Sequence, residues 1–219
     1  MIMLSFFMPG RRRYPDDQLS TAEEFSLPHA PIEISRTALL LMDYQPFIVD
    51  SAGEEGAAAL TRAKAAREHA RTAGLQVVHV RVAFTEQDYA SVSPRNKAFA
   101  GLAGARLLAD GSSEAAIHPD LGPGAGDVVV TKTRFGSFST TNLATHLHGR
   151  GIDTLIVAGI STSGVVLSTV RDAADRDYQL YVLSDCCADP HPEVHRVLIE
   201  HVFPHQAEVI SLDDFVGLL

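Results

Sequence analysis

The sequence has no tryptophan, only two cysteines and no long apolar run. The cysteines are adjacent, at Cys186 and Cys187, and are too few for a disulfide framework. Apolar runs such as 155–159 are far shorter than the roughly 20 residues that a membrane-spanning helix needs. The three arginines at 11–13 are followed by acidic residues, so no signal peptide is expected. These absences predict a cytoplasmic globular protein with no membrane partner.

Positive charge is also scarce. The 18 lysines and arginines are outnumbered by 27 aspartates and glutamates, which gives a net charge of -9. A nucleic acid or an anionic lipid surface would be repelled, so neither is expected as a partner. With 46% hydrophobic and 21% charged residues over 219 positions, the chain can bury a full core and is not expected to be disordered. A small-molecule substrate is the expected partner.

Several motifs are missing as well. The sequence contains neither GxxxxGK[ST] nor GxGxxG, which excludes a phosphate loop and a dinucleotide fingerprint. It also lacks GxSxG, the strand-to-helix turn that carries the nucleophile of most serine α/β-hydrolases. The chemistry is therefore expected to depend on other residues.

What is present is a regular alternation of apolar strands and helices. Strands are predicted over 37–43, 75–82, 127–131, 154–158, 179–183 and 207–210. Helices are predicted over 54–73, from Ser139 or Thr140 to 148, over 163–175 and over 192–201. This order predicts a three-layer α/β/α domain with a six-stranded parallel sheet over 36–219. Residues 1–35 are predicted to be an N-terminal arm.

Two charged residues end strands of this predicted sheet. Asp43 closes the first strand and Lys132 follows the third, and ligands of open parallel sheets bind beyond the carboxyl ends of the strands. A buried carboxyl group beside an ammonium group can donate or accept a proton, although a structural salt bridge explains the pair equally well. Asp185 also ends a strand, and we expect it to cap the following loop.

The turn at 159–166 joins a strand to a helix and is rich in small polar residues. Backbone amides at such a helix start can face an oxyanion or a carboxylate. Ordinary N-capping by Thr162 or Ser163 accounts for the same residues.

Several segments resemble the isochorismatase-like hydrolase superfamily. They are Leu39-Leu-Leu-Met-Asp43-Tyr-Gln45, Thr131-Lys132-Thr-Arg-Phe-Gly-Ser-Phe138, residues 151–162, residues 170–178 and Ser184-Asp-Cys-Cys-Ala-Asp189. The resemblance implies a six-stranded parallel sheet, a homodimer or homotetramer, and a catalytic triad of Asp, Lys and Cys. Asp43 and Lys132 match the first two positions. Ser161-Thr162 matches the place where the family often has a non-proline cis peptide that shapes the oxyanion hole.

The third position departs from the family pattern, because Val165 stands where the resemblance places the cysteine. Valine cannot form a thioester, and Cys187 matches a cysteine of the family's core. The resemblance includes one branch that works without the thiol: true isochorismatases, in which the Asp protonates a vinyl ether. The zinc-binding Asp-x-His of nicotinamidase-like members is also missing after Asp50. No metal and no cofactor are therefore expected.

Four interpretations stay open for the site. The favoured one is cleavage of a vinyl ether or similar acid-labile small molecule, with or without a carboxylate, through Asp43 and Lys132. The alternatives are water-mediated amide or ester hydrolysis, non-catalytic binding of a small molecule and, least supported, a redox or metal role. The residues expected to contact substrate or form the oxyanion hole are Ser161, Thr162, Gly164, Val165, Gln45, Phe84, Arg134 and Phe138. Selectivity is expected to lie in 84–101 and in the arm at 11–13, and Arg81, Arg95 or Arg134 could pair with a carboxylate.

Overall fold

A computed structural model describes residues 32–219 of the chain. The arm predicted over 1–35, with its arginines at 11–13, therefore lies almost wholly outside the described residues. A short 3-10 helix at Ile34–Arg36, which includes the last two residues of the predicted arm, leads into the first strand. None of the described helices is long and apolar enough to cross a membrane.

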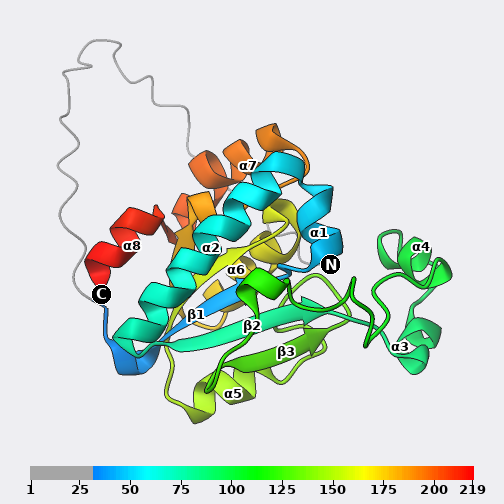
Figure 1. Ribbon diagram of the computed structural model, residues 1–219, viewed down its shortest axis with the longest axis horizontal. Coiled ribbons are helices and arrows are strands. Elements are labelled where there is room, and N and C mark those ends of the chain that lie inside the picture. The colour runs from blue at the N-terminus through cyan, green and yellow to red at the C-terminus, as the bar shows by residue number, and fades with distance from the viewer. Residues whose placement is uncertain (1–31) are drawn as a thin grey trace, which may run out of the picture. The chain divides into compact units, whose positions relative to one another are not determined.

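Six parallel strands form one sheet, as predicted (Figure 1). They are β1 (Thr37–Met42), β2 (Gln76–Val82), β3 (Val128–Lys132), β4 (Thr154–Gly159), β5 (Gln179–Leu183) and β6 (Glu208–Ile210). Their order across the sheet is β3-β2-β1-β4-β5-β6, so the chain starts near the middle and builds outward in both directions. The reversal of direction occurs between β1 and β4, which is where open sheets place their ligands.

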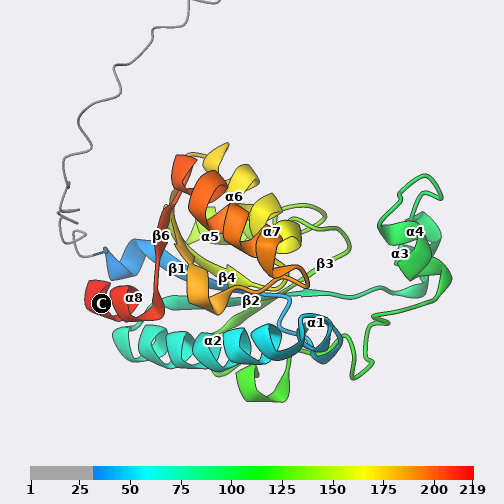
Figure 2. The ribbon, with the colours of Figure 1, turned by 90° about the horizontal axis from the view of Figure 1, so that it is seen from above.

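Helices cover both faces of the sheet, which makes the predicted three-layer arrangement (Figure 2). One face carries α1 (Pro46–Ser51), α2 (Gly53–Ala73) and α8 (Leu212–Leu218). The other carries α5 (Leu143–Gly149), α6 (Leu167–Ala174) and α7 (Pro192–Val197). Successive side chains of a strand point to opposite faces, so both faces of β1 must be apolar. Leu39 and Leu41 pack on the first face, and Leu40 and Met42 on the second.

Two helix boundaries show how well local signals located the elements. The helix predicted over 54–73 is α2, and it ends at Gly74, whose φ of 85° is a left-handed conformation that suits glycine. By contrast, Ser139 or Thr140 was expected to start the next helix, whereas α5 begins at Leu143. Thr140 has a φ of 62°, and its hydroxyl accepts a hydrogen bond from the Thr133 N–H, so it belongs to the preceding loop.

The long connection after β2 forms a small lobe at the end of the sheet (Figure 1). It contains α3 (Glu86–Ser91) and α4 (Phe99–Gly104), followed by a 3-10 helix at Pro119–Leu121. Thr85 and Asp88 start α3 with a reciprocal capping box. The lobe has an apolar cluster of its own, which includes Tyr89 and Phe99 and is separate from the two main clusters. Part of the segment expected to set selectivity is therefore an ordered lobe.

The remaining segments are short and helical. A π-helical turn at Thr162–Val166 leads into α6, and another at Leu198–Val202 continues α7 and is followed by a 3-10 turn at Phe203–His205. Another 3-10 turn, at Ser184–Cys186, follows β5.

Candidate functional site

Asp43 and Lys132 meet at the carboxyl edge of the sheet. Asp43 directly follows β1 and Lys132 ends β3, two strands that lie on either side of β2. The Lys132 side chain spans the gap, and its Nζ donates to Asp43 Oδ2 at 2.7 Å and to the Arg134 carbonyl at 3.0 Å. Asp43 is 5% exposed and Lys132 is 2% exposed. The two charges that sequence reasoning placed at strand ends thus form a buried pair.

The backbone and the environment of Asp43 are both unusual. Its φ of 60° is left-handed, a region that Asp tolerates better than most residues. Its second oxygen, Oδ1, is buried and has no hydrogen-bond partner among the described residues. Burial raises the pKa of this carboxyl group, and the charge and hydrogen bond of Lys132 oppose the shift without cancelling it. Asp43 therefore holds a proton more readily than an exposed aspartate does.

The turn after β4 lies next to this pair. The Ile160–Ser161 peptide bond is cis, one residue before the Ser161-Thr162 pair singled out in the sequence. N-capping by Thr162 or Ser163 was one of the two explanations of this turn, but neither the π-helical turn nor α6 starts with a side-chain cap hydrogen bond. The Asp189 carboxylate instead accepts from the Ser163 N–H at 2.8 Å and from the His191 N–H at 3.1 Å.

A cavity of about 200 Å³ opens beside the buried pair. Its lining comes from the ends of β1, β2 and β3, from α1 and α4, and from the turn after β4. The lining residues are Asp43, Phe47, Ile48, Ser51, Val82, Phe99, Leu102, Leu108, Lys132, Phe135, Ile160, Ser161, Gly164, Val165 and Pro190. A side chain at Gly164 would come within 2.7 Å of Ser161 Oγ, so glycine keeps this wall open.

Comparison with known sequences identifies the family of the chain that forms this cavity. Residues 37–214 match the isochorismatase domain. The chain belongs to the isochorismatase family. YecD of Escherichia coli O157:H7, named an isochorismatase family protein, is 31% identical over 193 residues, which cover 84% of this chain and 96% of YecD. RutB of Rhizobium rhizogenes, a ureidoacrylate amidohydrolase, is 31% identical over 221 residues, which cover 90% of this chain and 86% of RutB.

Solved structures agree on the fold. A cysteine hydrolase from Pseudomonas syringae pv. phaseolicola 1448A superposes with a TM-score of 0.78 and 24% identity, covering 87% of this chain and 95% of that one. The family match and the relatives together confirm the resemblance to the isochorismatase-like hydrolases. They also support assigning the chain as a hydrolase.

Five of the ten residues expected to form the isochorismatase-family site do line the cavity. They are Asp43, Lys132, Ser161, Gly164 and Val165. Val165 is only 2% exposed. No cysteine is among the lining residues, and Ser161 Oγ makes no hydrogen bond within the described part of the chain.

Two of the other five have structural roles in the core, which corrects the expectation that they contact substrate. Gln45 is fully buried, and its amide bonds both the N–H and the carbonyl of Val82 and also the Ala115 carbonyl. Phe138 points into the cluster between the sheet and α5 and α6, where it lies 6.0 Å from the Tyr178 ring. Gln45 and Phe138 thus point away from the cavity, although they lie close in sequence to Asp43 and Lys132.

The remaining three also lie outside the cavity lining. Phe84 is buried in the lobe and stacks on Tyr89, with the ring centroids 5.2 Å apart. Thr162 is fully buried, and its hydroxyl is 2.8 Å from His195 Nδ1. The Arg134 guanidinium lies over the Phe99 ring, 5.6 Å from its centroid, so it contacts a residue of the cavity wall without lining the cavity.

Sequence reasoning named Val165, placed Phe135 beside the lysine and included Phe99 in the segment 84–101, but it did not single out most of the apolar residues of the cavity. Phe47 and Ile48 come from α1, Phe99 and Leu102 from α4, and Phe135 from the loop after β3. The only local signal was that Phe135 lies three residues after Lys132. The α4 residues reach the site through the long-range packing of the lobe, which sequence periodicity does not reveal.

The two cysteines are inert in this structure. Both are buried and free. Burial raises the pKa of the Cys187 thiol to about 12, and it also raises that of Cys186, whose neighbour Asp185 adds to the shift. Asp185 itself accepts from the Leu212 N–H at 3.0 Å and pairs with Arg62 at 3.5 Å, so it holds the start of α8 (Leu212–Leu218) instead of the loop directly after β5 that it was expected to cap. Within residues 32–219, no group of three or more His, Cys, Asp or Glu residues is placed to hold a metal ion.

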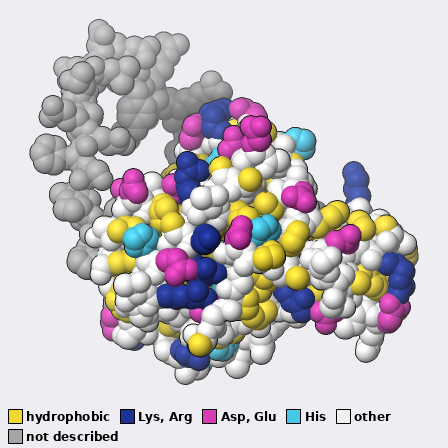
Figure 3. Space-filling model, in the orientation of Figure 1, with side chains coloured by type: hydrophobic (Ala, Val, Ile, Leu, Met, Phe, Trp, Pro, Cys, Tyr) yellow, Lys and Arg dark blue, Asp and Glu magenta, His cyan; other side chains and the backbone are white. Residues whose placement is uncertain are grey.

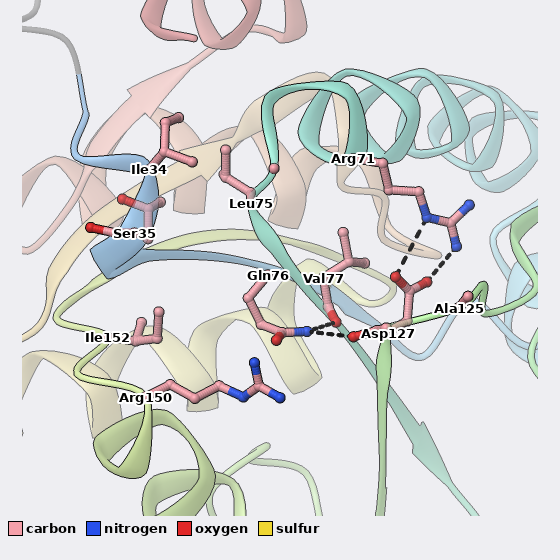
Figure 4. A pocket seen from close by; sticks show the side chains of 13 residues that line it. Ile34, Ser35, Arg71, Leu75, Gln76, Val77, Ala125, Asp127, Arg150 and Ile152 are labelled. Carbon is pink, nitrogen blue, oxygen red and sulfur yellow. Dashed lines mark hydrogen bonds and ion pairs between the residues drawn. The ribbon is translucent and has the colours of Figure 1, made fainter.

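A second cavity, of about 570 Å³, lies at the amino-terminal edge of the sheet (Figure 4). Its acidic residue, Asp127, is already paired with Arg71 and also accepts from the Gly124 N–H and lies 3.0 Å from His79 Nε2. The Gln76 side-chain amide donates hydrogen bonds to the Val77 and Gly126 carbonyls. Because these groups are satisfied within the fold, we take the smaller cavity at Asp43 as the candidate active site.

Proposed function

We propose that this hydrolase uses Asp43 and Lys132 for acid–base chemistry without a cysteine nucleophile. One observation carries the proposal: Asp43 lines the cavity with one oxygen held by Lys132 and the other unpaired, while no thiol lines the same cavity. A thioester route needs a thiolate, and both thiols of this chain are buried elsewhere with raised pKa values.

The favoured reaction is the cleavage of a vinyl ether. A buried carboxyl group with a raised pKa is suited to act as a general acid. Asp43 gives its proton to the terminal carbon of the double bond, and the ether carbon becomes an oxocarbenium ion. The Asp43 carboxylate that remains is stabilised by the Lys132 ammonium group, 2.7 Å away in the resting site.

Water completes the reaction. It adds to the oxocarbenium carbon and returns one proton to Asp43, which regenerates the acid. The hemiketal or hemiacetal then collapses to a carbonyl compound and an alcohol. One water is consumed, the ether C–O bond is broken, and no covalent enzyme intermediate forms.

Amide or ester hydrolysis is the second candidate, because a 31% identical relative is named ureidoacrylate amidohydrolase. In that reaction ionised Asp43 would take a proton from water as the water attacks the carbonyl carbon. The raised pKa of Asp43 makes it a stronger base than an exposed aspartate once it is ionised, but it also reduces the ionised fraction.

Isotope labelling separates the two reactions. Phenyl vinyl ether cleaved in D₂O should give phenol and acetaldehyde with one deuterium in its methyl group, because the transferred proton comes from solvent through Asp43. Benzamide hydrolysed in H₂¹⁸O should give benzoate with one ¹⁸O. Deuterium at carbon supports the acid route, and ¹⁸O in benzoate supports the second candidate.

Variants test the residues in either case. Asp43→Asn should lower turnover by about 100-fold or more while the near-UV circular dichroism stays native, since a general acid or base typically contributes 10²–10⁴-fold. Asp185→Asn is the matched control: it removes a strand-end carboxylate that does not line the cavity, and its activity should be unchanged. Full activity of Asp43→Asn would refute the proposal.

A further inference from the structure

The candidate active site is almost entirely apolar apart from its charged pair. Besides Asp43 and Lys132, only Ser51 and Ser161 bring polar side chains to the lining. The other walls are Phe47, Ile48, Val82, Phe99, Leu102, Leu108, Phe135, Ile160, Gly164, Val165 and Pro190. Among the described residues that line the cavity there is no arginine and no histidine.

The one cation in the cavity is already engaged. Lys132 Nζ donates to Asp43 Oδ2 and to the Arg134 carbonyl. Two of the three ammonium N–H groups are therefore used within the fold, which leaves a substrate carboxylate a single N–H of Lys132, and its other oxygen would be buried without a charged partner among the described lining residues. Arg81 and Arg134, expected as carboxylate partners, do not line the cavity; Arg81 pairs with Asp110 at 2.7 Å.

The size of the cavity suits one ring. An apolar protein cavity of about 150 Å³ can hold benzene. The cavity here is about 200 Å³, which leaves room for a ring and one small reacting group beside Asp43. Phe99 and Phe135 meet edge-to-face with centroids 4.9 Å apart, and the guanidinium of Arg134 lies over the Phe99 ring at 5.6 Å.

The rim of the cavity is apolar as well. Phe47 is 41% exposed and Phe135 is 48% exposed, and both line the cavity. Figure 3 shows hydrophobic side chains along the junction between α1 and the lobe that carries α3 and α4. Large exposed aromatic side chains around a pocket mark a surface that an apolar ligand covers.

We propose that the substrate presents an uncharged apolar group, about the size of a single aromatic ring, to the wall formed by Phe99, Leu102 and Phe135. Its reacting bond then lies at Asp43, a placement that rests on the proposed function. Compounds recognised mainly through a carboxylate are poor substrates. The sequence left open whether the substrate carries a carboxylate, and this proposal favours a substrate without one.

The equilibrium binding of three small molecules tests this substrate class without requiring turnover. Benzamide and benzoate share a ring and differ in charge, whereas benzamide and acetamide share an amide and differ in the ring. Isothermal titration calorimetry should show benzamide binding at least about tenfold more tightly than either of the others. Equal or tighter binding of benzoate, or equal binding of acetamide, would overturn the inference.

A pair of variants places the binding at this wall. Leu102→Asn puts a polar group of similar size into the cavity and should weaken benzamide binding about tenfold or more. Val92→Asn is the matched control, because Val92 is also a half-buried apolar residue of the lobe but does not line this cavity. Equal effects of the two variants would show that benzamide binds elsewhere or responds only to the stability of the lobe.

The outcome is separable from that of the proposed function. Tight benzamide binding together with full activity of Asp43→Asn would leave the substrate class standing and remove the acid–base role. Deuterium transfer to a carboxylate-bearing vinyl ether, with no turnover of phenyl vinyl ether, would keep the role of Asp43 and overturn the substrate class.

Discussion

Replacing Lys132 with methionine isolates the energetic role of the buried pair. The variant keeps a side chain of similar length but removes the one positive charge that lines the cavity among the described residues, which lies 2.7 Å from Asp43 Oδ2. Breaking a buried ion pair by removing one partner typically costs about 3–5 kcal/mol, because the remaining charge is buried without compensation. With Asp43 5% exposed, we expect a loss in this range at pH 8.

The loss should depend on pH in a definite direction. Burial raises the folded-state pKa of Asp43 above its ordinary value of 3.8, so its protonated form is favoured by folding. Stability linked to such a group is fully present at low pH and is lost as pH rises toward the folded-state pKa. Lys132 opposes the rise, so Lys132→Met should move the folded-state pKa further up. Between the two folded-state values, the difference in unfolding free energy should grow by about 1.4 kcal/mol per pH unit.

Urea unfolding of both proteins from pH 5 to pH 8 measures this difference. Arg196→Met serves as the control, because Arg196 forms exposed ion pairs with Glu193 and Glu200. Exposed pairs of this kind contribute little, so the control should show a small loss with no trend over this pH range. A loss in Lys132→Met that is equal at pH 5 and pH 8 would refute the idea that Asp43 is the group left uncompensated.

Two further predictions concern residues that do not line the cavity. The thiols of the native protein should react slowly with a reagent such as DTNB, because burial raises the pKa values of Cys186 and Cys187. Both should react rapidly in urea. A native thiol that reacts rapidly would contradict the assignment of both cysteines as unreactive. Gln45→Leu should lower the unfolding free energy in urea by at least about 2 kcal/mol, since it removes the partner of the buried Val82 N–H and carbonyl and leaves the Ala115 carbonyl with Arg81 alone. A neutral effect would return Gln45 to the list of candidate ligand contacts.

The fold was predictable because its signals are local and repeated. A buried parallel strand is apolar on both faces, and each of the six predicted runs became a strand of the sheet. The rule that parallel strands end at one edge then placed Asp43 and Lys132 together, although β2 lies between their strands. The predicted homodimer or homotetramer and the cytoplasmic location stay predictions.

Side-chain direction was the part that the sequence could not supply. Gln45 and Phe138 lie two and six residues from the charged pair, yet one bonds the backbone and the other packs beneath α5 and α6. Phe99 and Leu102 lie in a connection without clear periodicity, and they reach the cavity only because the lobe folds around its own apolar cluster. Contacts of this kind depend on tertiary packing and have no local signature.

Val165 gives the two proposals a common basis. Its side chain packs closely against the β4 end, since a Cβ at Gly159 would lie 3.3 Å from Val165 Cγ1, and it belongs to the apolar cluster beneath the sheet. A nucleophilic thiolate needs neighbours that stabilise negative charge, whereas this wall offers apolar contacts to a ligand. The residue that removes the thioester route therefore also extends the apolar surface of the cavity. Catalysis in such a site falls to Asp43 and Lys132, and the Lys132 charge compensates the carboxylate that Asp43 becomes when it gives its proton to an uncharged substrate.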